Sequence, residues 1–201
     1  MLKEGELSVW RIRLDEVDEE RCLPLSAREL DRAARFRFEK DRLRYTRSHG
    51  ALRSILAAVT NAPLDFAERE HGKPYLPAAP EVRFNLSHSH EIALVGVALE
   101  VEIGVDIERV RPVPNCESIA ERFFPPSEAA AFAAAPREAR EREFFRRWAR
   151  IEAVLKAQGV GLHGAGAELP SEWVVEEIDA GADYVAAAAA ARAFRVVVHD
   201  F

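Results

Sequence analysis

The chain has 201 residues and a net charge of −6 at pH 7, with 28 lysine and arginine residues against 34 aspartate and glutamate residues. This length is enough for one substantial hydrophobic core or for two small cores built together. An acidic balance argues against bulk nucleic-acid binding, which needs an excess of cations to neutralise phosphates. The two cysteines, Cys22 and Cys116, stand in no CxxC or Cys/His pattern, so we expect neither a disulfide framework nor a zinc site.

The N-terminal segment and the apolar stretches show no pattern of secretion or membrane insertion. No apolar signal core follows Met1, and no apolar stretch approaches the length that spans a membrane. We therefore expect a soluble protein in the reducing environment of the cytoplasm, with neither a membrane nor nucleic acid as its partner.

Basic residues gather between about residues 28 and 53, although the whole chain is acidic. Such a run has two interpretations, a local site for an anion or a solvated helix face, and the second is the commoner explanation. The residues are Arg28, Arg32, Arg35, Arg37, Lys40, Arg42, Arg44, Arg47 and Arg53.

The first half of the chain is expected to begin with a strand and two helices. Residues 8–15 alternate apolar and polar side chains, which predicts a half-buried strand. Ser26, with Glu29 three positions later, fits a capping box, so a helix is predicted from there to about residue 38. Apolar residues at helical spacing predict a second helix over residues 41–59, ended by Pro63.

A short strand and a buried hairpin are expected next. Residues 66–70 predict the short strand, and His71-Gly72 predicts a turn. Residues 92–99 form an uninterrupted apolar run of strand length. We expect residues 100–102 to turn this run into a second strand over residues 103–108, which gives a buried hairpin.

The predicted strand over residues 103–108 places two carboxylates together. Gly104, Asp106 and Glu108 alternate with apolar residues, so their positions share one face. The missing side chain of Gly104 leaves room for something to approach the backbone. Two oxygen donors on one face suit Mg²⁺, although such a pair also occurs on solvated surfaces. Both interpretations stay open at this point.

The second half of the chain is expected to follow a stiff connection at Arg111 to Pro114. Helices are predicted through residues 119–123, from residue 128 with Ser127 as its cap, and over residues 137–158 up to Gly159. The last helix has a core stripe at Phe144, Trp148, Ile151 and Leu155.

Glu152 and Lys156 lie along the flank of that stripe, one helical turn apart. Their positions suit a functional site at the edge of a buried seam or a routine ion pair.

Strands are predicted over residues 173–178 and 194–198, and the alanine-rich residues 184–191 between them are expected to form a small-residue strand. The order of elements indicates an α+β fold and shows no GxGxxG motif of a Rossmann fold.

Six runs along the chain resemble the motifs of the 4'-phosphopantetheinyl transferase family, in its monomeric, two-lobed, surfactin-synthetase-activating type. Each run alone is moderately specific for this family, but six runs in the family's order are strong evidence of the resemblance. The runs are RFRFEKDRLRYTRSHGALRSILA (Arg35 to Ala57), HGKPYLP (His71 to Pro77), FNLSHS (Phe84 to Ser89), GVDIE (Gly104 to Glu108), RFFPPSE (Arg122 to Glu128) and WARIEAVLKAQGVGL (Trp148 to Leu162).

The resemblance implies an enzyme that moves the phosphopantetheine arm of coenzyme A onto a serine of an apo acyl or peptidyl carrier protein and releases 3',5'-ADP. It also implies two pseudo-symmetric lobes, each with a small, mainly antiparallel sheet packed on a long helix, and an active site in the cleft between them. We place the N-terminal lobe at residues 1–110 and the C-terminal lobe at residues 111–201 of one compact unit. We expect a monomer.

The same resemblance assigns roles by position in the motifs. The family's Mg²⁺ ligands fall on Asp106, Glu108 and Glu152, and Mn²⁺ is an alternative ion. Glu152 is also the expected general base for the serine hydroxyl, either directly or through a metal-bound water, and Lys156 is expected to stabilise or protonate the departing 3',5'-ADP. Glu128 is expected to assist the base, or simply to stand in the first turn of a helix. The expected coenzyme A contacts are Arg32, Arg44, Arg53, Lys73, Pro74, Ser87 and His88.

Two positions depart from the family pattern. Many members carry lysine where this chain has Ile151, so a catalytic lysine there is absent and the base role is placed on Glu152. His90 stands where glycine is common and is expected to narrow the loop near the ligand.

Two other classes of function compete with the enzyme. A module that binds coenzyme A and the carrier protein without catalysis would keep the basic cluster and tolerate loss of the acids, but Asp106, Glu108, Glu152 and Lys156 are all present. A nucleic-acid-binding protein would be basic overall, and this chain is acidic.

Overall fold

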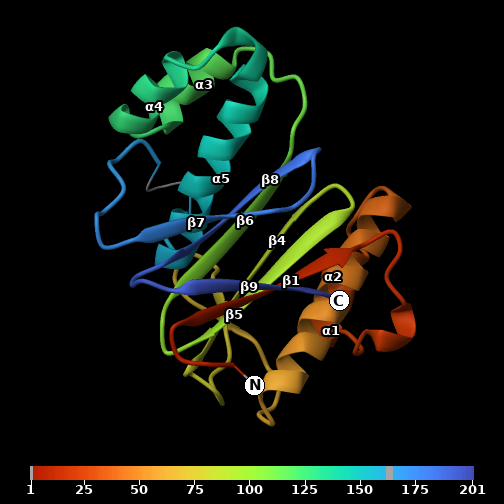
Figure 1. The fold of residues 1–201 in the computed structure, drawn as a ribbon. Coiled ribbons are helices and arrows are strands. Elements are labelled where there is room, and N and C mark those ends of the chain that lie inside the picture. The colour runs from red at the N-terminus through yellow and green to blue at the C-terminus, as the bar shows by residue number, and fades with distance from the viewer. Residues whose placement is uncertain (1, 162–164) are drawn as a thin grey trace.

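The computed structural model describes residues 2–161 and 165–201 and shows two small sheets, each packed on a long helix (Figure 1). Leu162, the end of the sixth motif, and Met1 lie outside the described residues. The larger sheet has the strand order β4-β5-β1-β9 and the smaller one β6-β8-β7, so the predicted α+β class is confirmed. The strands are β1 (Glu6–Arg13), β4 (Val82–Ser89), β5 (Ile92–Leu99) and β9 (Arg195–Asp200), then β6 (Ile103–Arg109), β7 (Val174–Ile178) and β8 (Tyr184–Ala190), with a separate pair β2 (Ala67–Glu68) and β3 (Pro74–Tyr75).

The helices follow the predicted order with small differences at their ends. The capping box of Ser26 and Glu29 is present, but its helix ends at Ala33 rather than near residue 38. The predicted cap at Ser127 is wrong, because that helix begins at Pro126 and the Ser127 hydroxyl donates instead to Glu168. The helices are α1 (Ala27–Ala33), α2 (Glu39–Val59), α3 (Cys116–Phe123), α4 (Pro126–Ala133) and α5 (Arg140–Gln158), with 3₁₀ turns at Glu19–Arg21 and Arg137–Ala139.

The predicted hairpin of β5 with β6 is wrong. Strand β5 pairs with β4 and β1, whereas β6 pairs with β8 of the other sheet. Side chains of β4 take two of the backbone N–H groups of β6: the N–H of Val105 donates to Asn85 Oδ1 at 2.8 Å and that of Arg109 to Ser89 Oγ at 3.1 Å. Strand β6 therefore runs beside the larger sheet but joins it through side chains instead of a backbone ladder.

The alanine-rich segment forms β8, as predicted, and its small side chains let α5 come close. Ala187 and Ala189 belong to the core cluster that contains the apolar stripe of α5. On β6, a Cβ at Gly104 would lie 2.0 Å from the carbonyl oxygen of Ala153 in α5. The space that the sequence left at Gly104 is therefore occupied by the backbone of α5. Since β6 and β8 are neighbours, small residues on both strands form the seat of this helix.

The larger sheet has its own core and joins the two ends of the chain. Leu52, Ile55 and Leu56 of α2 pack in one cluster with Phe84 of β4 and Val95 of β5. The last strand, β9, lies parallel to the first, β1, so the sheet takes strands from both ends of the sequence (Figure 1). Both sheets contain strands from either side of residue 110, and the division into lobes at 1–110 and 111–201 remains a prediction.

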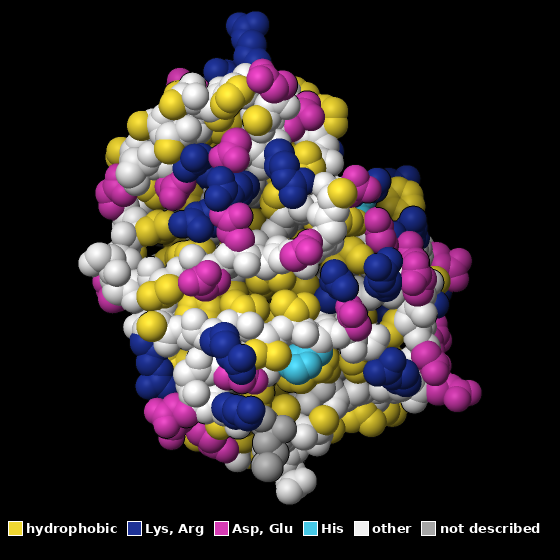
Figure 2. Space-filling model, in the orientation of Figure 1, with side chains coloured by type: hydrophobic (Ala, Val, Ile, Leu, Met, Phe, Trp, Pro, Cys, Tyr) yellow, Lys and Arg dark blue, Asp and Glu magenta, His cyan; other side chains and the backbone are white. Residues whose placement is uncertain are grey.

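The surface is of mixed charge. On the face drawn in Figure 2, lysine and arginine side chains lie interspersed with aspartate and glutamate. Within the described ranges, none of the helices is long and apolar enough to cross a membrane.

Replacing Gly104 by alanine is expected to destabilise the fold, because the new Cβ would collide with helix backbone at Ala153 and push α5 from β6. We expect a loss of at least about 2 kcal/mol in the free energy of unfolding, within the range for overpacked cores, measured by chemical denaturation. Gly96→Ala is the comparison, because its Cβ would meet side-chain atoms of Val105 and Ile103, which adjust more readily than helix backbone. An equal or smaller loss for Gly104→Ala would contradict this account of the seat of α5.

Candidate functional site

Three carboxylates and one ammonium group face one another between β6 and α5. Asp106 and Glu108 lie on the same face of β6 as Gly104, and that face meets α5. Glu152 and Lys156 lie on α5 at the flank of its core stripe and are both partly buried. The two periodicities predicted these pairs separately, and the close approach at Gly104 brings them together.

Asp106 is the centre of this cluster. It is only 4% exposed, and its Oδ1 accepts hydrogen bonds from Ser87 Oγ at 2.8 Å and from Lys156 Nζ at 2.5 Å. Lys156 Nζ also donates to Ser87 Oγ at 2.9 Å, so β4, β6 and α5 meet at this point. The other oxygen, Oδ2, is buried and has no hydrogen-bond partner among the described residues. A buried carboxylate oxygen without a donor needs an explanation, such as a bound cation or water.

Glu108 and Glu152 are held in an environment that disfavours their charged forms. Burial raises the pKa of Glu108, and the neighbouring charge of Asp106 adds to this. Burial also raises the pKa of Glu152; the charges of Asp106 and Glu108 act in the same direction, and Lys156 opposes them. Glu108 accepts from Ser89 Oγ at 3.1 Å and from Arg111 Nη1 at 3.5 Å. Three mutually repelling carboxylates would be stabilised by a divalent cation.

The fit to Mg²⁺ rests on the type of the donors and on the unpartnered oxygen. Carboxylate oxygens are the donors that Mg²⁺ prefers, and Asp106 Oδ2 is free to accept an ion. Within residues 2–161 and 165–201, however, no group of three or more acidic, histidine or cysteine side chains already has a metal-binding arrangement. The positive charge that Asp106 contacts in the structure is the Lys156 ammonium.

His88 lies near Lys156 of this cluster and also near Arg44. His88 lies at the surface, but the protein around its ring partly desolvates it, and this desolvation together with the nearby charges of Lys156 and Arg44 lowers its pKa. Arg44 forms two hydrogen bonds with Asp15, at 2.9 and 2.6 Å, and lies 3.5 Å from Glu91. Of the predicted coenzyme A contacts, Ser87 therefore contacts Lys156, and His88 lies near both Lys156 and Arg44.

The rest of the basic segment is largely paired with carboxylates. Arg53 is buried and donates to Glu29 at 2.8 Å, which links α2 to the capping box of α1. Arg32 lies exposed on α1. The solvated, ion-paired interpretation thus describes much of the run, and the roles of Arg32, Arg44 and Arg53 toward coenzyme A stay predictions. The pairs are Arg28 with Glu68, Arg42 with Glu39, Arg44 with Asp15, Arg47 with Glu19 and Arg53 with Glu29.

Two other predicted contacts, Lys73 and Pro74, lie at the start of β3. The Lys73 ammonium is buried and bonded to protein atoms of β6, α5 and the turn before β6. Pro74 lines a narrow space beside the same turn, together with Tyr75 and Glu102. Neither residue contacts the carboxylate cluster directly, and their roles toward coenzyme A also stay predictions.

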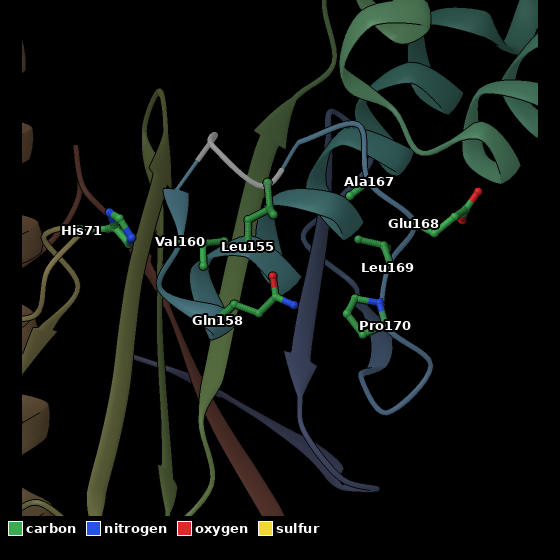
Figure 3. Close-up of a pocket in the computed structure, with 8 residues that line it drawn as sticks. All are labelled: His71, Leu155, Gln158, Val160, Ala167, Glu168, Leu169 and Pro170. Carbon is green, nitrogen blue, oxygen red and sulfur yellow. The ribbon is translucent and has the colours of Figure 1, made fainter.

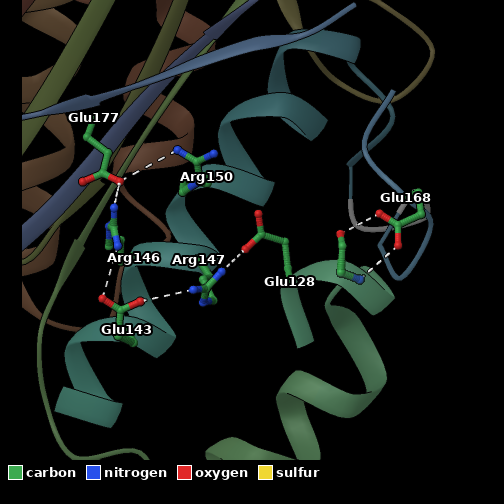
Figure 4. Close-up of polar contacts among 8 residues, drawn as sticks. Glu128, Glu143, Arg146, Arg147, Arg150, Glu168 and Glu177 are labelled. Atoms are coloured by element: carbon green, nitrogen blue, oxygen red, sulfur yellow. Dashed lines mark hydrogen bonds and ion pairs between the residues drawn. The ribbon is translucent and has the colours of Figure 1, made fainter. Parts of the chain in front are cut away.

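Glu128 lies in a different charged network. In the first turn of α4 it forms an ion pair with Arg147 of α5 (Figure 4). Arg147 also contacts Glu143, and Glu143 contacts Arg146, which reaches Glu177 on β7. The network ties α4 and β7 to α5, and no contact of Glu128 with the carboxylate cluster is present among the described residues. Its assistance to a base remains a prediction.

Several residues of the site escaped the sequence analysis although one pattern could have shown them. Asn85, Ser87 and Ser89 alternate along β4, so their side chains share the face toward β6. This polar alternation is visible in the motif FNLSHS, but only Ser87 and His88 were selected from it. Arg111 had no signal, because its contact with Glu108 depends on where the chain leaves β6.

The two departures from the family pattern have local explanations. Ile151 is 3% exposed and continues the apolar stripe of α5, as predicted. His90 has a φ of 54° in the turn between β4 and β5, a left-handed conformation that favours glycine.

A hollow of about 540 Å³ lies beside the last turn of α5 and is mostly apolar (Figure 3). Its lining contains none of the clustered charges of Asp106, Glu108, Glu152 and Lys156.

Comparison with known proteins points to one family. Residues 102–199 match the model of the 4'-phosphopantetheinyl transferase superfamily. The 4'-phosphopantetheinyl transferase HetI of Nostoc sp. is 40% identical over 170 residues, which cover 80% of this chain and 72% of HetI. A 4'-phosphopantetheinyl transferase of Bacillus subtilis is 32% identical, and Sfp of Bacillus subtilis is 28% identical. Each alignment with a Bacillus subtilis protein covers 69% of this chain but only 62% of the relative.

The variant Glu152→Gln is expected to be more stable than the wild type near pH 7 when no divalent cation is present. The folded pKa of Glu152 is raised, so its contribution to stability is fully present below the unfolded pKa and is lost as the pH rises through the folded pKa. A glutamine does not ionise and escapes this loss. Thermal unfolding in a chelator, followed by circular dichroism, should show a higher Tm for the variant near pH 7 and none of this gain near pH 4.

Glu176→Gln, on the exposed side of β7, is the control for this measurement and should not change the pH dependence. The repulsion among the three carboxylates would be refuted if Glu152→Gln melted at the wild-type temperature or below it throughout the pH range.

Proposed function

This chain belongs to the 4'-phosphopantetheinyl transferase superfamily, and on that premise we propose that it transfers the 4'-phosphopantetheine group of coenzyme A to a serine of an apo acyl or peptidyl carrier protein and releases 3',5'-ADP. The observation that carries the proposal is the meeting of Asp106, Glu108 and Glu152 with Lys156 between β6 and α5. That cluster supplies what pyrophosphate cleavage requires: a site for a cation, a proton acceptor and a positive charge for the leaving group.

The reaction joins two partners at the β-phosphorus of coenzyme A. The serine oxygen of the carrier protein forms a bond to this phosphorus, and the bond from phosphorus to the oxygen of the α-phosphate breaks. Asp106, Glu108 and Glu152 would hold Mg²⁺, or Mn²⁺, which when bound neutralises the negative charge of the pyrophosphate. The unpartnered Oδ2 of Asp106 and the mutual repulsion of the acids support this assignment.

Glu152 accepts the proton of the serine hydroxyl in this proposal. Its raised pKa makes its carboxylate a stronger base than that of an exposed glutamate. Glu152 lies at the edge of the core stripe rather than within it, so a hydroxyl from a carrier protein can approach. The residue directly before it in the sequence is Ile151, which is buried in the core against which α5 packs.

Lys156 stabilises the leaving 3',5'-ADP. Its side chain is 28% exposed, and it holds Asp106 and Ser87 through hydrogen bonds that rotation about its flexible stem can exchange for a phosphate oxygen. His88 and Arg44 lie on the same side and would face the nucleotide's 3'-phosphate. Arg44 keeps its pair with Asp15 while doing so, because a guanidinium has five N–H donors.

The competing function is a catalytically inactive module that binds coenzyme A and a carrier protein. It would need a basic face for the ligand but no reason to bury Asp106 beside Glu108 and Glu152, an arrangement that disfavours the charged acids. The location in the cytoplasm, with neither membrane nor nucleic acid as a partner, stays a prediction from the sequence, and the monomer stays a prediction from the family resemblance.

The direct test is to incubate the protein with coenzyme A, Mg²⁺ and an apo carrier protein and to weigh the carrier by mass spectrometry. We expect the carrier to gain one phosphopantetheine group and an equivalent amount of 3',5'-ADP to appear. A chelator should suppress the gain, and Mg²⁺ or Mn²⁺ should restore it. No mass gain with carriers from fatty-acid, polyketide and peptide synthesis would refute the enzyme and favour the binding module.

Asp106→Asn is expected to lower the rate of transfer by at least about 100-fold, the scale of losing a key charge-stabilising group, because the amide weakens cation binding. The same amide can keep a hydrogen bond with Ser87, so circular dichroism and a cooperative melt should still show a folded protein. Glu177→Gln removes a carboxylate of β7 that pairs with Arg146, away from the cluster, and should retain full activity. Wild-type rates in Asp106→Asn would exclude it as a cation ligand.

A further inference from the structure

Lys73 lies at the end of the turn that joins β2 to β3, and its ammonium is enclosed by protein. Its side chain is 8% exposed. Nζ donates to Glu102 Oε2 at 2.8 Å, to the carbonyl oxygen of Ile103 at 3.0 Å and to that of Ala157 at 2.8 Å. An ammonium group has three N–H donors, so all of them are used within the protein.

The three acceptors belong to two elements that the site depends on. Ile103 is the first residue of β6, and Glu102 stands just before it. Ala157 is in the last turn of α5, where helix carbonyls lack intrahelical partners and a cation is favoured by the helix dipole. The stem of Lys73 also packs on the end of this helix, because a Cβ at Gly159 would lie 3.3 Å from Lys73 Cδ. Lys73 therefore closes the C-terminal end of α5 onto the first residue of β6.

The bonds of Lys73 lie beside the contact between β6 and α5 that sets the distance between Asp106 and Lys156. A Cβ at Gly104 would lie 2.5 Å from the N atom of Ala157, so β6 and α5 touch through their backbones next to the Lys73 ammonium. Asp106 follows on β6, and Lys156 directly precedes Ala157 on α5. A shift of α5 relative to β6 at this end would alter the distance between Asp106 and Lys156, which is 2.5 Å in the structure.

The buried charge of Lys73 is balanced locally. Glu102 also contacts Arg69 at 2.9 Å and Arg83 at 3.2 Å, so one carboxylate is shared by three cations. Arg69 is the most exposed of these, with a side chain 43% exposed, and it has no contact with α5 among the interactions described. Removing Arg69 should therefore weaken the charge balance around Glu102 without breaking the bonds from Lys73 to β6 and α5.

We propose that Lys73 is a positioning residue, which holds the start of β6 against the end of α5 and so fixes the spacing of Asp106 from Lys156, and that it does not grip the ligand. Its effect on catalysis rests on the proposed transferase function, whereas its effect on α5 does not.

The test compares Lys73→Met, which keeps the length of the stem and loses the ammonium, with Arg69→Met as the control. In the transfer assay we expect Lys73→Met to lower kcat by at least about 10-fold, while the KM for coenzyme A and its Kd, measured by calorimetry, change by less than about 2-fold. Lys73→Arg keeps the charge and should recover part of kcat, and Arg69→Met should behave like the wild type. A rise of KM and Kd with an unchanged kcat would overturn the proposal and make Lys73 a ligand contact.

Hydrogen exchange separates this proposal from the proposed function. Amides in the last turn of α5 and at the start of β6 should exchange faster in Lys73→Met than in the wild type, whether or not the protein transfers phosphopantetheine. Unchanged exchange there would overturn the positioning role, and absent transfer in the wild type would refute only the enzyme. If Lys73→Met does not fold, Glu102→Gln, which keeps an acceptor but loses the charge, decides by the same exchange and kinetic readouts.

Discussion

The close approach of α5 to β6 at Gly104 is the contact on which the rest of this structure depends. A single methyl group at that position would lie 2.0 Å from the backbone of the helix, so the spacing is set by the absence of a side chain. On the neighbouring strand β8, the small side chains of Ala187 and Ala189 also allow the helix to pack closely. The helix therefore lies close enough to β6 for the Lys156 ammonium to reach Asp106.

This arrangement is electrostatically unfavourable for the ionised carboxylates. Glu108 and Glu152 are partly buried near Asp106, and desolvation and mutual repulsion disfavour their charged forms. Asp106 keeps one buried oxygen without a partner, and its other oxygen relies on Ser87 and Lys156. Proteins often accept unfavourable local electrostatics at functional sites, where a ligand relieves them.

The fold contributes rigidity on both sides of the cluster. Strand β4 holds β6 through Asn85, Ser87 and Ser89, whose side chains replace a backbone ladder. Because β4 and β6 belong to different sheets, the contact links the two sheets at the place where the charges meet. The pairing of β9 with β1 then ties the end of the chain back to the larger sheet. The cluster thus lies where several elements, distant in sequence, restrain one another.

The sequence by itself determined the class of the fold, most elements and the two halves of the site. Alternation along β6 placed Asp106 and Glu108 on one face, and helical spacing placed Glu152 and Lys156 together, because both patterns are local. Only the tertiary structure decided that β6 pairs with β8 rather than with β5, since an apolar strand can pair with any available edge. It alone showed that Lys73 and Arg53 are bonded within the protein, because their partners, Ala157 and Glu29, come near them only when the chain folds.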